Sequence, residues 1–188
     1  MRKIMLKKVS FMVDFVNFKR YNKQTFGKRW DGSVLNIVLV EPEIPQNCGN
    51  IARTCAATGS RLHLVKPLGF DISEKAVRRA GLDYWQYVDL RVHESLEDFL
   101  AEYGDRRMFL ATTKGGIKYT DASFRDDDML LFGRETAGLP RELIEARKDC
   151  AIRIPMSKST ELRSLNLSNA VSIVLFEALR QLGFPELR

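Results

Sequence analysis

The sequence predicts an α/β fold in which a parallel β-sheet carries helices on both faces. The main observation is that short β-rich runs alternate with helical segments along the chain, an alternation typical of parallel sheets. A second observation is that glycines follow two of these segments, at Gly59 and Gly104, where a helix commonly ends. The length of 188 residues fits one domain with a full-sized core, or one domain plus an appendage.

In the first half of the chain, a short β-rich run at residues 35–40 predicts a buried strand. The polar stretch 41–48 predicts a loop that contains prolines, and residues 49–58 predict a helix that Gly59 ends. Residues 61–65 predict a second strand. Two more helices are predicted at 73–80 and 95–103, because a serine at the start of each can cap its N-terminus.

In the second half, residues 108–111 and 129–132 predict strands that each lead into a loop with glycine. A proline at the first turn indicates a helix at 140–147, and residues 151–154 predict a last strand. A long helix is predicted from about residue 166 to 182, and its segment 170–176 is apolar nearly all round. Such a helix must bury more than one face, either as a central core helix or by also packing on a second subunit.

Charge is concentrated at the start of the chain. Residues 1–33 contain nine basic and two acidic side chains, whereas the whole chain has a net charge of +6, so residues 34–188 are close to neutral. We predict that residues 1–33 are a basic leader, either an arm that binds RNA or a non-native, disordered segment upstream of a natural start at Val34. Lys28-Arg29-Trp30 can be encoded by a purine-rich stretch that resembles a bacterial ribosome-binding site.

Several functional classes are disfavoured. The three cysteines, Cys48, Cys55 and Cys150, form no CxxC pair, and only two histidines are present, so no metal site is predicted. The thiols are expected to be buried and reduced in a cytoplasmic protein. No apolar run is long enough for a membrane span. Neither GxGxxG, nor GxxxxGK[ST], nor GxSxG occurs in the sequence, which argues against a dinucleotide-binding site, a P-loop and a hydrolase elbow.

Three loops that follow predicted strands contain candidate ligand-binding residues. They span residues 112–116, 133–140 and 155–166, and ligands of parallel sheets gather at the carboxyl ends of strands. Taken singly, each loop is adequately explained as a tight turn. Taken together, they favour a nucleotide-like pocket, because glycine lets a backbone approach its ligand closely.

A fourth polar stretch, residues 41–54, surrounds the start of the first predicted helix and includes Arg53. Helix N-termini favour anions such as RNA phosphates. The alternative is that Asn47 or Asn50 only caps the helix and that Arg53 is a solvated charge.

These stretches resemble the motifs of one known family, the TrmH-like branch of the SPOUT methyltransferases. Asn47-x-Gly49-Asn50-Ile51-x-Arg53-Thr54 resembles the first motif. Phe132-Gly133-x-Glu135-Thr136-x-Gly138-Leu139-Pro140 resembles the second. The third is resembled by Ile154-Pro155-Met156 together with Ser164-Leu165-Asn166-Leu167-Ser168-Asn169. Residues 41–47 and 78–85 narrow the resemblance to the enzymes that 2′-O-methylate the wobble cytidine or uridine of tRNA. The resemblance covers about residues 35–183.

The resemblance implies a fold with a C-terminal trefoil knot and a homodimer whose active site spans both chains. It implies S-adenosylmethionine as cofactor, no metal, and tRNA as substrate in the cytoplasm. Residues 34–188 would form the methyltransferase domain. The implied cofactor-binding residues are Ala111, Gly133, Ile154, Met156, Ser164 and Leu165, with Thr112 and Glu135 nearby. The implied catalytic residues are Arg53 and Asn166.

A guanidinium with a pKa above ~12 rarely loses its proton. We therefore expect Arg53 to orient a phosphate and to stabilise the developing alkoxide, while water, phosphate or a carboxylate such as Glu135 takes the proton. Candidate RNA-binding residues are Arg78, Arg79, Lys114, Lys118, Arg134, Lys158 and Arg163. Two alternatives remain: a 2′-O-methyltransferase for another tRNA or rRNA position, and a noncatalytic RNA-binding protein with the same knot.

Overall fold

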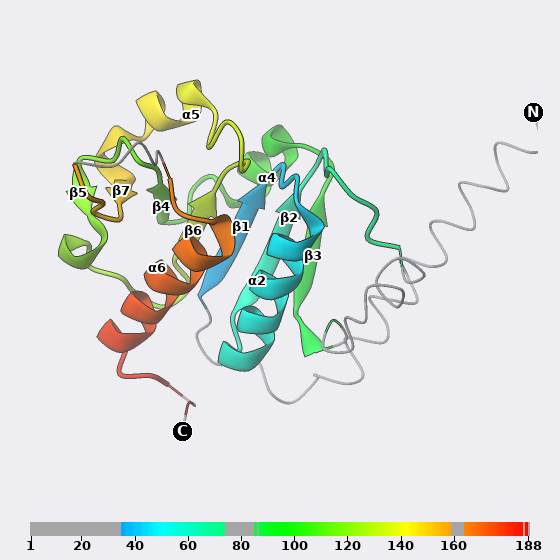
Figure 1. Cartoon of the computed structure of the whole chain (residues 1–188), viewed down its shortest axis with the longest axis horizontal. Helices are drawn as coiled ribbons and strands as arrows, with labels where there is room; N and C mark the ends of the chain where they lie inside the picture. The colour runs from blue at the N-terminus through cyan, green and yellow to red at the C-terminus, as the bar shows by residue number, and fades with distance from the viewer. Residues whose placement is uncertain (1–34, 74–84, 86, 159–163, 186, 188) are drawn as a thin grey trace, which may run out of the picture. The chain divides into compact units, whose positions relative to one another are not determined.

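A single parallel sheet organises the chain. The structure, a computed structural model, describes residues 35–73, 85, 87–158, 164–185 and 187. Within these residues the strands pair in the order β3-β2-β1-β6-β4-β7-β5, and every pairing is parallel (Figure 1). The strands are β1 (Asn36–Val40), β2 (Arg61–Val65), β3 (Leu90–His93), β4 (Met108–Ala111), β5 (Ile117–Lys118), β6 (Met129–Phe132) and β7 (Ala151–Arg153).

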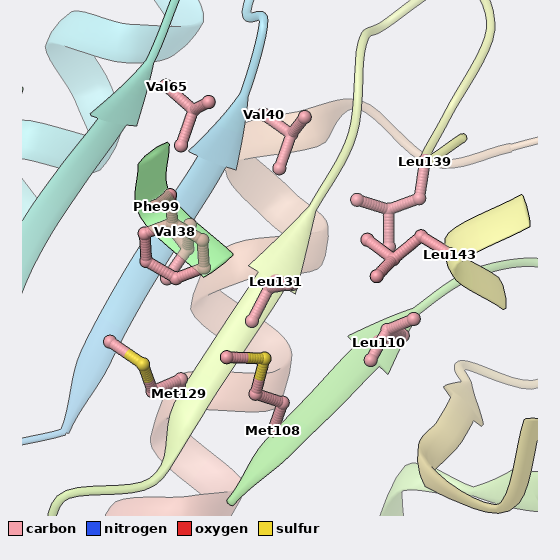
Figure 2. Packing of buried hydrophobic residues seen from close by; sticks show 10 residues of the cluster. All are labelled: Val38, Val40, Val65, Phe99, Met108, Leu110, Met129, Leu131, Leu139 and Leu143. Carbon is pink, nitrogen blue, oxygen red and sulfur yellow. The ribbon is translucent and has the colours of Figure 1, made fainter. Parts of the chain in front are cut away.

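Helices cover both faces of this sheet, as the sequence predicts. On one face α2 (Pro45–Thr58) and α6 (Leu167–Gln181) pack side by side (Figure 1). On the other face α4 (Leu96–Tyr103) and α5 (Arg141–Ala146) contribute Phe99 and Leu143 to a buried apolar cluster. Figure 2 shows this cluster on the side of the sheet opposite α6. Its other members are Val38, Val40, Val65, Met108, Leu110, Met129, Leu131 and Leu139.

The start of α2 is the one predicted boundary that is clearly wrong. The helix begins at Pro45 rather than at residue 49, with Ile44 as its N-cap and no side-chain cap. Proline is well suited to this place, because its missing N–H would have no partner in the first turn. The stretch 45–48 is therefore helical, and neither Asn47 nor Asn50 caps the helix. Its end is as predicted, since Gly59 has a φ of 73°.

Two strands were not predicted, namely β3 and β5. The pairs of β3 with β2 and of β5 with β7 define them, and β5 has only two residues, too few for a periodic pattern. The predicted helix at 73–80 and the leader at 1–33 lie outside the described residues, so both stay predictions. The remaining predicted elements are confirmed with boundaries shifted by one or two residues.

The connection between β4 and β5 crosses β7. In the sheet β7 lies between these two strands, with Ala111 of β4 on one side of Ile152 and Ile117 of β5 on the other. The crossing is very close, because a Cβ added to Gly115 would lie 2.5 Å from the carbonyl carbon of Ile152. The backbone N–H of Thr112 also donates to the Ile152 carbonyl oxygen, at 2.9 Å.

Two stacked histidines and Asn36 form a buried polar network that links the side chains of β1, β2 and β3. His63 Nδ1 lies 3.0 Å from His93 Nε2, and His63 Nε2 lies 3.2 Å from Asn36 Oδ1. Phe99 and Tyr103 of α4 pack edge-on against both rings. Burial, together with the nearby His93 and arginines, lowers the pKa of His63 to about 2. Burial also lowers the pKa of His93.

The crossing predicts that alanine substitution lowers stability at one of two neighbouring glycines and leaves it nearly unchanged at the other. Gly115→Ala should lower the free energy of unfolding by about 1–3 kcal/mol, because the new methyl group meets the rigid backbone of Ile152. Gly116→Ala is the matched control, since nothing lies within 4 Å of its added Cβ, and a change below about 0.5 kcal/mol is expected. Urea unfolding of both variants measures the difference, and equal stabilities would contradict the close crossing.

The histidine network predicts that the protein loses stability between pH 7.5 and 5.5. Below pH 6.5 the unfolded chain takes up protons at His63 and His93 that the folded chain does not, so stability falls as the pH falls. The expected loss is about 1 kcal/mol from His63, with a further contribution of the same sign from His93, and urea unfolding at several pH values measures it. His63→Gln should flatten this dependence, whatever its effect on stability at pH 7.5. An unchanged slope in the variant would argue against a buried neutral histidine.

Candidate functional site

Three of the predicted cofactor-binding residues lie at the carboxyl edge of three adjacent strands. Ala111 is the last residue of β4, Gly133 directly follows β6, and Ile154 directly follows β7. Since β6, β4 and β7 are neighbours in the sheet, the fold brings these three positions to one edge. The other three predicted residues, Met156, Ser164 and Leu165, lie exposed on the connection from β7 to α6.

The loop after β6 is held in one shape by close backbone contacts. Arg134 and Gly138 exchange two backbone hydrogen bonds, at 3.2 and 2.9 Å. A Cβ added to Gly133 would lie 2.0 Å from the carbonyl carbon of Gly138, so no side chain fits at position 133. Gly138 itself has a φ of 72°, a value that favours glycine. The loop is thus a tight turn, and at Gly133 and Gly138 it carries backbone without a side chain.

The three motifs of the sequence are joined by hydrogen bonds. The carboxylate of Glu135 accepts from the backbone N–H groups of Glu43 and Ile44, at 2.9 and 3.2 Å, and from Asn47 Nδ2, at 2.9 Å. Asn47 Oδ1 in turn accepts from Asn166 Nδ2, also at 2.9 Å. A chain of side chains therefore runs from the loop after β6, through the first turn of α2, to the start of α6.

Asn166 is the N-cap of α6. Its Oδ1 accepts from the backbone N–H of Ser168, at 2.9 Å, and from the Ser168 hydroxyl, at 2.7 Å. Both polar atoms of its side-chain amide are thus hydrogen-bonded: Oδ1 accepts from the first turn of α6, and Nδ2 donates to Asn47. The catalytic role that the resemblance implies for Asn166 stays a prediction.

The Glu135 contacts are a feature that sequence reasoning missed. The sequence suggests Glu135 as a proton acceptor, but three donors already occupy its carboxylate. Its observed role is to hold the turn between β1 and α2. A further pair of contacts has the same effect, because the Thr136 backbone N–H and hydroxyl both donate to Glu43 Oε2, at 3.1 and 2.7 Å.

The predicted RNA-binding residues differ in how available they are. Arg134 forms an ion pair with Glu41, so its charge is largely satisfied within the chain. Lys114, Lys118 and Lys158 are exposed and stay candidates. Arg78, Arg79 and Arg163 lie outside the described residues.

Arg53 is not brought to the carboxyl edge within one chain. It lies exposed on α2, six residues beyond Asn47, which places it about 9 Å further along the helix axis. The site residues predicted from the sequence are therefore assembled only in part. Ala111, Gly133 and Ile154 lie at the edge, whereas Arg53 is exposed on α2.

A separate cavity of about 700 Å³ opens between α4 and α5, beside the carboxyl ends of β1, β2 and β3. None of the predicted site residues lines it. Its lining is Glu41, Lys66, Pro67, Glu94, Ser95, Leu96, Glu97, Leu100, Pro140, Glu142, Leu143, Ala146 and Arg147.

Cys48 and Cys55 are buried, as the sequence predicts, whereas Cys150 is half-buried. Burial raises the pKa of Cys48 to about 12 and also raises the pKa of Cys55, so neither is a ready nucleophile. Among the described residues, no group of three or more His, Cys, Asp or Glu side chains is placed to hold a metal ion. No helix in the described part of the chain is long and apolar enough to cross a membrane.

Comparison with known proteins identifies close relatives. Residues 34–176 match the model of the SpoU rRNA Methylase family. A tRNA (cytidine(34)-2′-O)-methyltransferase from Escherichia coli (strain K12) is 50% identical over 153 residues, covering 81% of this chain and 96% of that protein. An enzyme with the same name from Methylovorus glucosotrophus is 48% identical over 152 residues, covering 80% of this chain and 97% of that protein.

Solved structures agree with these matches. A protein whose structure addresses the 2′-OH methylation of C/U34 on tRNA has a TM-score of 0.73 and 48% identity, covering 80% of this chain and 97% of that one. An rRNA methyltransferase from Sinorhizobium meliloti with bound AdoMet has a TM-score of 0.69 and 29% identity, covering 79% of this chain and 57% of that one.

The contacts of Glu135 predict that its charge stabilises the site. Glu135→Gln replaces one acceptor oxygen by an NH₂ group that faces a backbone donor, so the free energy of unfolding should fall by about 1–3 kcal/mol. Glu142→Gln is the control, because Glu142 is exposed on α5 and should change stability by less than about 0.5 kcal/mol. Thermal and urea unfolding report both values. Equal stability of the two variants would show that the carboxylate does not hold the turn.

Proposed function

Because this chain belongs to the SpoU rRNA Methylase family, we propose that it transfers a methyl group from S-adenosylmethionine to the ribose 2′-hydroxyl of nucleotide 34 of tRNA, a cytidine or a uridine. The observation that carries the proposal is the near full-length similarity to tRNA (cytidine(34)-2′-O)-methyltransferases. The carboxyl edge supports it, since the three motifs meet there through Glu135, Asn47 and Asn166.

The methyl donor would be held by Ala111, Gly133, Ile154, Met156, Ser164 and Leu165. Two observations support this placement. The turn at Gly133 presents backbone without a side chain, which suits recognition of polar edges of adenosine by amide groups. Met156 and Leu165 are large apolar side chains that are 37% and 41% exposed, and a flat adenine ring would cover such surface.

The donor, when bound, supplies an activated methyl group on its sulfonium, so the protein needs to align the two reactants and to manage the proton of the 2′-hydroxyl. Asn166 and Asn47 would order the edge on which the donor sits. Arg53 would orient a phosphate of the RNA and stabilise the negative charge that develops on the 2′-oxygen. Because the Glu135 carboxylate is already occupied by three donors, water or an RNA phosphate is the better acceptor for the proton.

We also propose that the enzyme works as a homodimer through the face formed by α2 and α6. Arg53 is exposed on α2, about 9 Å along the helix axis from Asn47, and in a dimer the second chain would bring its own arginine to each site. The apolar ring of Phe176 on α6 is 47% exposed, which suits burial in an interface.

A C-terminal trefoil knot belongs to the same proposal. The crossing of β7 by the connection from β4 to β5 supports it, as does the family resemblance. A tRNA substrate further favours a cytoplasmic location.

The proposal is tested by incubating the protein with total tRNA and labelled S-adenosylmethionine and then mapping the modified nucleotide. Methylation of the 2′-hydroxyl of C34 or U34 is expected. Label at another tRNA position would show that the enzyme acts on a different nucleotide, and binding of tRNA without any transfer would indicate a noncatalytic protein.

Arg53 should be needed for turnover. Arg53→Ala should lower kcat by about 10²–10³, because a donor to the developing oxyanion is lost, and Arg53→Lys should restore only part of the activity because a point charge cannot reproduce the guanidinium fork. Arg141→Lys, an exposed arginine on α5 paired with Glu145, is the matched control. Near-normal turnover of Arg53→Lys would count against a bidentate role.

A further inference from the structure

We infer that Arg153 is a positioning residue for the methyl donor and that it acts through the connection from β4 to β5. The inference rests on the proposed function, because it takes the carboxyl edge of β4, β6 and β7 as the donor site. Arg153 is the last residue of β7 and directly precedes Ile154.

The guanidinium of Arg153 binds two successive glycine carbonyls. Its Nη1 donates to Gly115 O, at 2.7 Å, and to Gly116 O, at 2.6 Å. Hydrogen bonds from a charged donor are short and strong. Both carbonyl oxygens therefore turn toward β7, and the orientation of the two peptide groups is set by this one side chain.

This part of the connection needs such support. Glycine has the largest conformational freedom of any residue, and a side chain at Gly115 is ruled out by the backbone of Ile152. The space beside Gly116 is open, with nothing within 4 Å of an added Cβ. Residues 115 and 116 thus cannot be held by packing of their own side chains, and Arg153 supplies contacts that packing does not.

The same connection borders the proposed donor site. It begins at Thr112, directly after Ala111, where the Thr112 N–H donates to Ile152 O at 2.9 Å and the Gly115 N–H donates to Thr112 O at 3.2 Å. The pairing of β5 with β7 fixes the other end. If the Arg153 contacts are lost, the glycine pair between these ends gains freedom, and the donor must order it on binding. That cost weakens binding of the donor rather than the chemical step.

The experiment compares Arg153→Gln and Arg153→Lys with the wild-type protein. Calorimetry measures the Kd of S-adenosylhomocysteine, steady-state kinetics measure KM for the methyl donor, KM for tRNA and kcat, and thermal unfolding measures Tm. Arg153→Gln should weaken S-adenosylhomocysteine binding at least tenfold and raise KM for the donor similarly, while KM for tRNA and kcat at saturating donor stay within about threefold. Arg153→Lys should fall between the two, because an ammonium keeps the charge and can still donate, but on a flexible side chain of different reach.

Arg147→Lys is the matched control. Arg147 Nη2 also donates to a glycine carbonyl, Gly104 O, at 2.8 Å, but it lies at the end of α5 and away from the proposed donor site. This variant should leave the Kd of S-adenosylhomocysteine within twofold of the wild-type value.

The outcomes separate the inference from the function on which it rests. If the wild-type protein binds S-adenosylhomocysteine and both Arg153 variants bind it equally well, the inference is wrong and the proposed function stands. If Tm, tRNA binding and donor binding all fall together in the Arg153→Lys variant, Arg153 is a general stabilising residue and the inference is again wrong. If the wild-type protein itself binds neither S-adenosylhomocysteine nor the methyl donor, the proposed function and the inference fail together.

Discussion

The carboxylate of Glu135 is the contact on which the candidate site depends. It joins the turn before α2 to the loop after β6, through Glu43, Ile44 and Asn47. Asn47 then extends this link to Asn166 and the start of α6. A buried or half-buried carboxylate with several donors is costly to disturb, since each lost partner leaves a polar group unsatisfied. The site is therefore held by one connected polar network.

A second constraint is the use of glycine where two backbones approach each other. Gly115 lies against Ile152, and Gly133 lies against Gly138, with no space for a Cβ in either place. At both places backbone packs directly against backbone, so the edge of the sheet is compact there and carries no side chain. Arg153 fits this arrangement, because a surface built from glycine must be held by side chains from elsewhere. The proposed donor site thus combines a bare backbone edge with supporting residues that do not touch the ligand.

The sequence was sufficient for most elements of the fold and for the positions of the motifs. Strands at β4 and β6 match the predicted ranges, because short apolar runs bounded by glycine loops are a local signal. The start of α2 was mistaken because a proline and two asparagines are typical of loops, while proline is equally suited to a first helical turn. The strand β5 could not be predicted, since two residues become a strand only by pairing with β7.

The sequence by itself determined the alternation of strands and helices, the buried character of Cys48 and Cys55, and the family resemblance of the three motifs. Tertiary structure alone decided that Glu135 binds Asn47, 88 residues away, and that Asn47 binds Asn166, 119 residues away. It also decided that Arg134 pairs with Glu41 and that Arg153 binds two glycine carbonyls. The physical reason is that helix and strand patterns arise between near neighbours in the chain. A hydrogen bond between distant segments depends instead on which strands lie next to each other in the folded sheet.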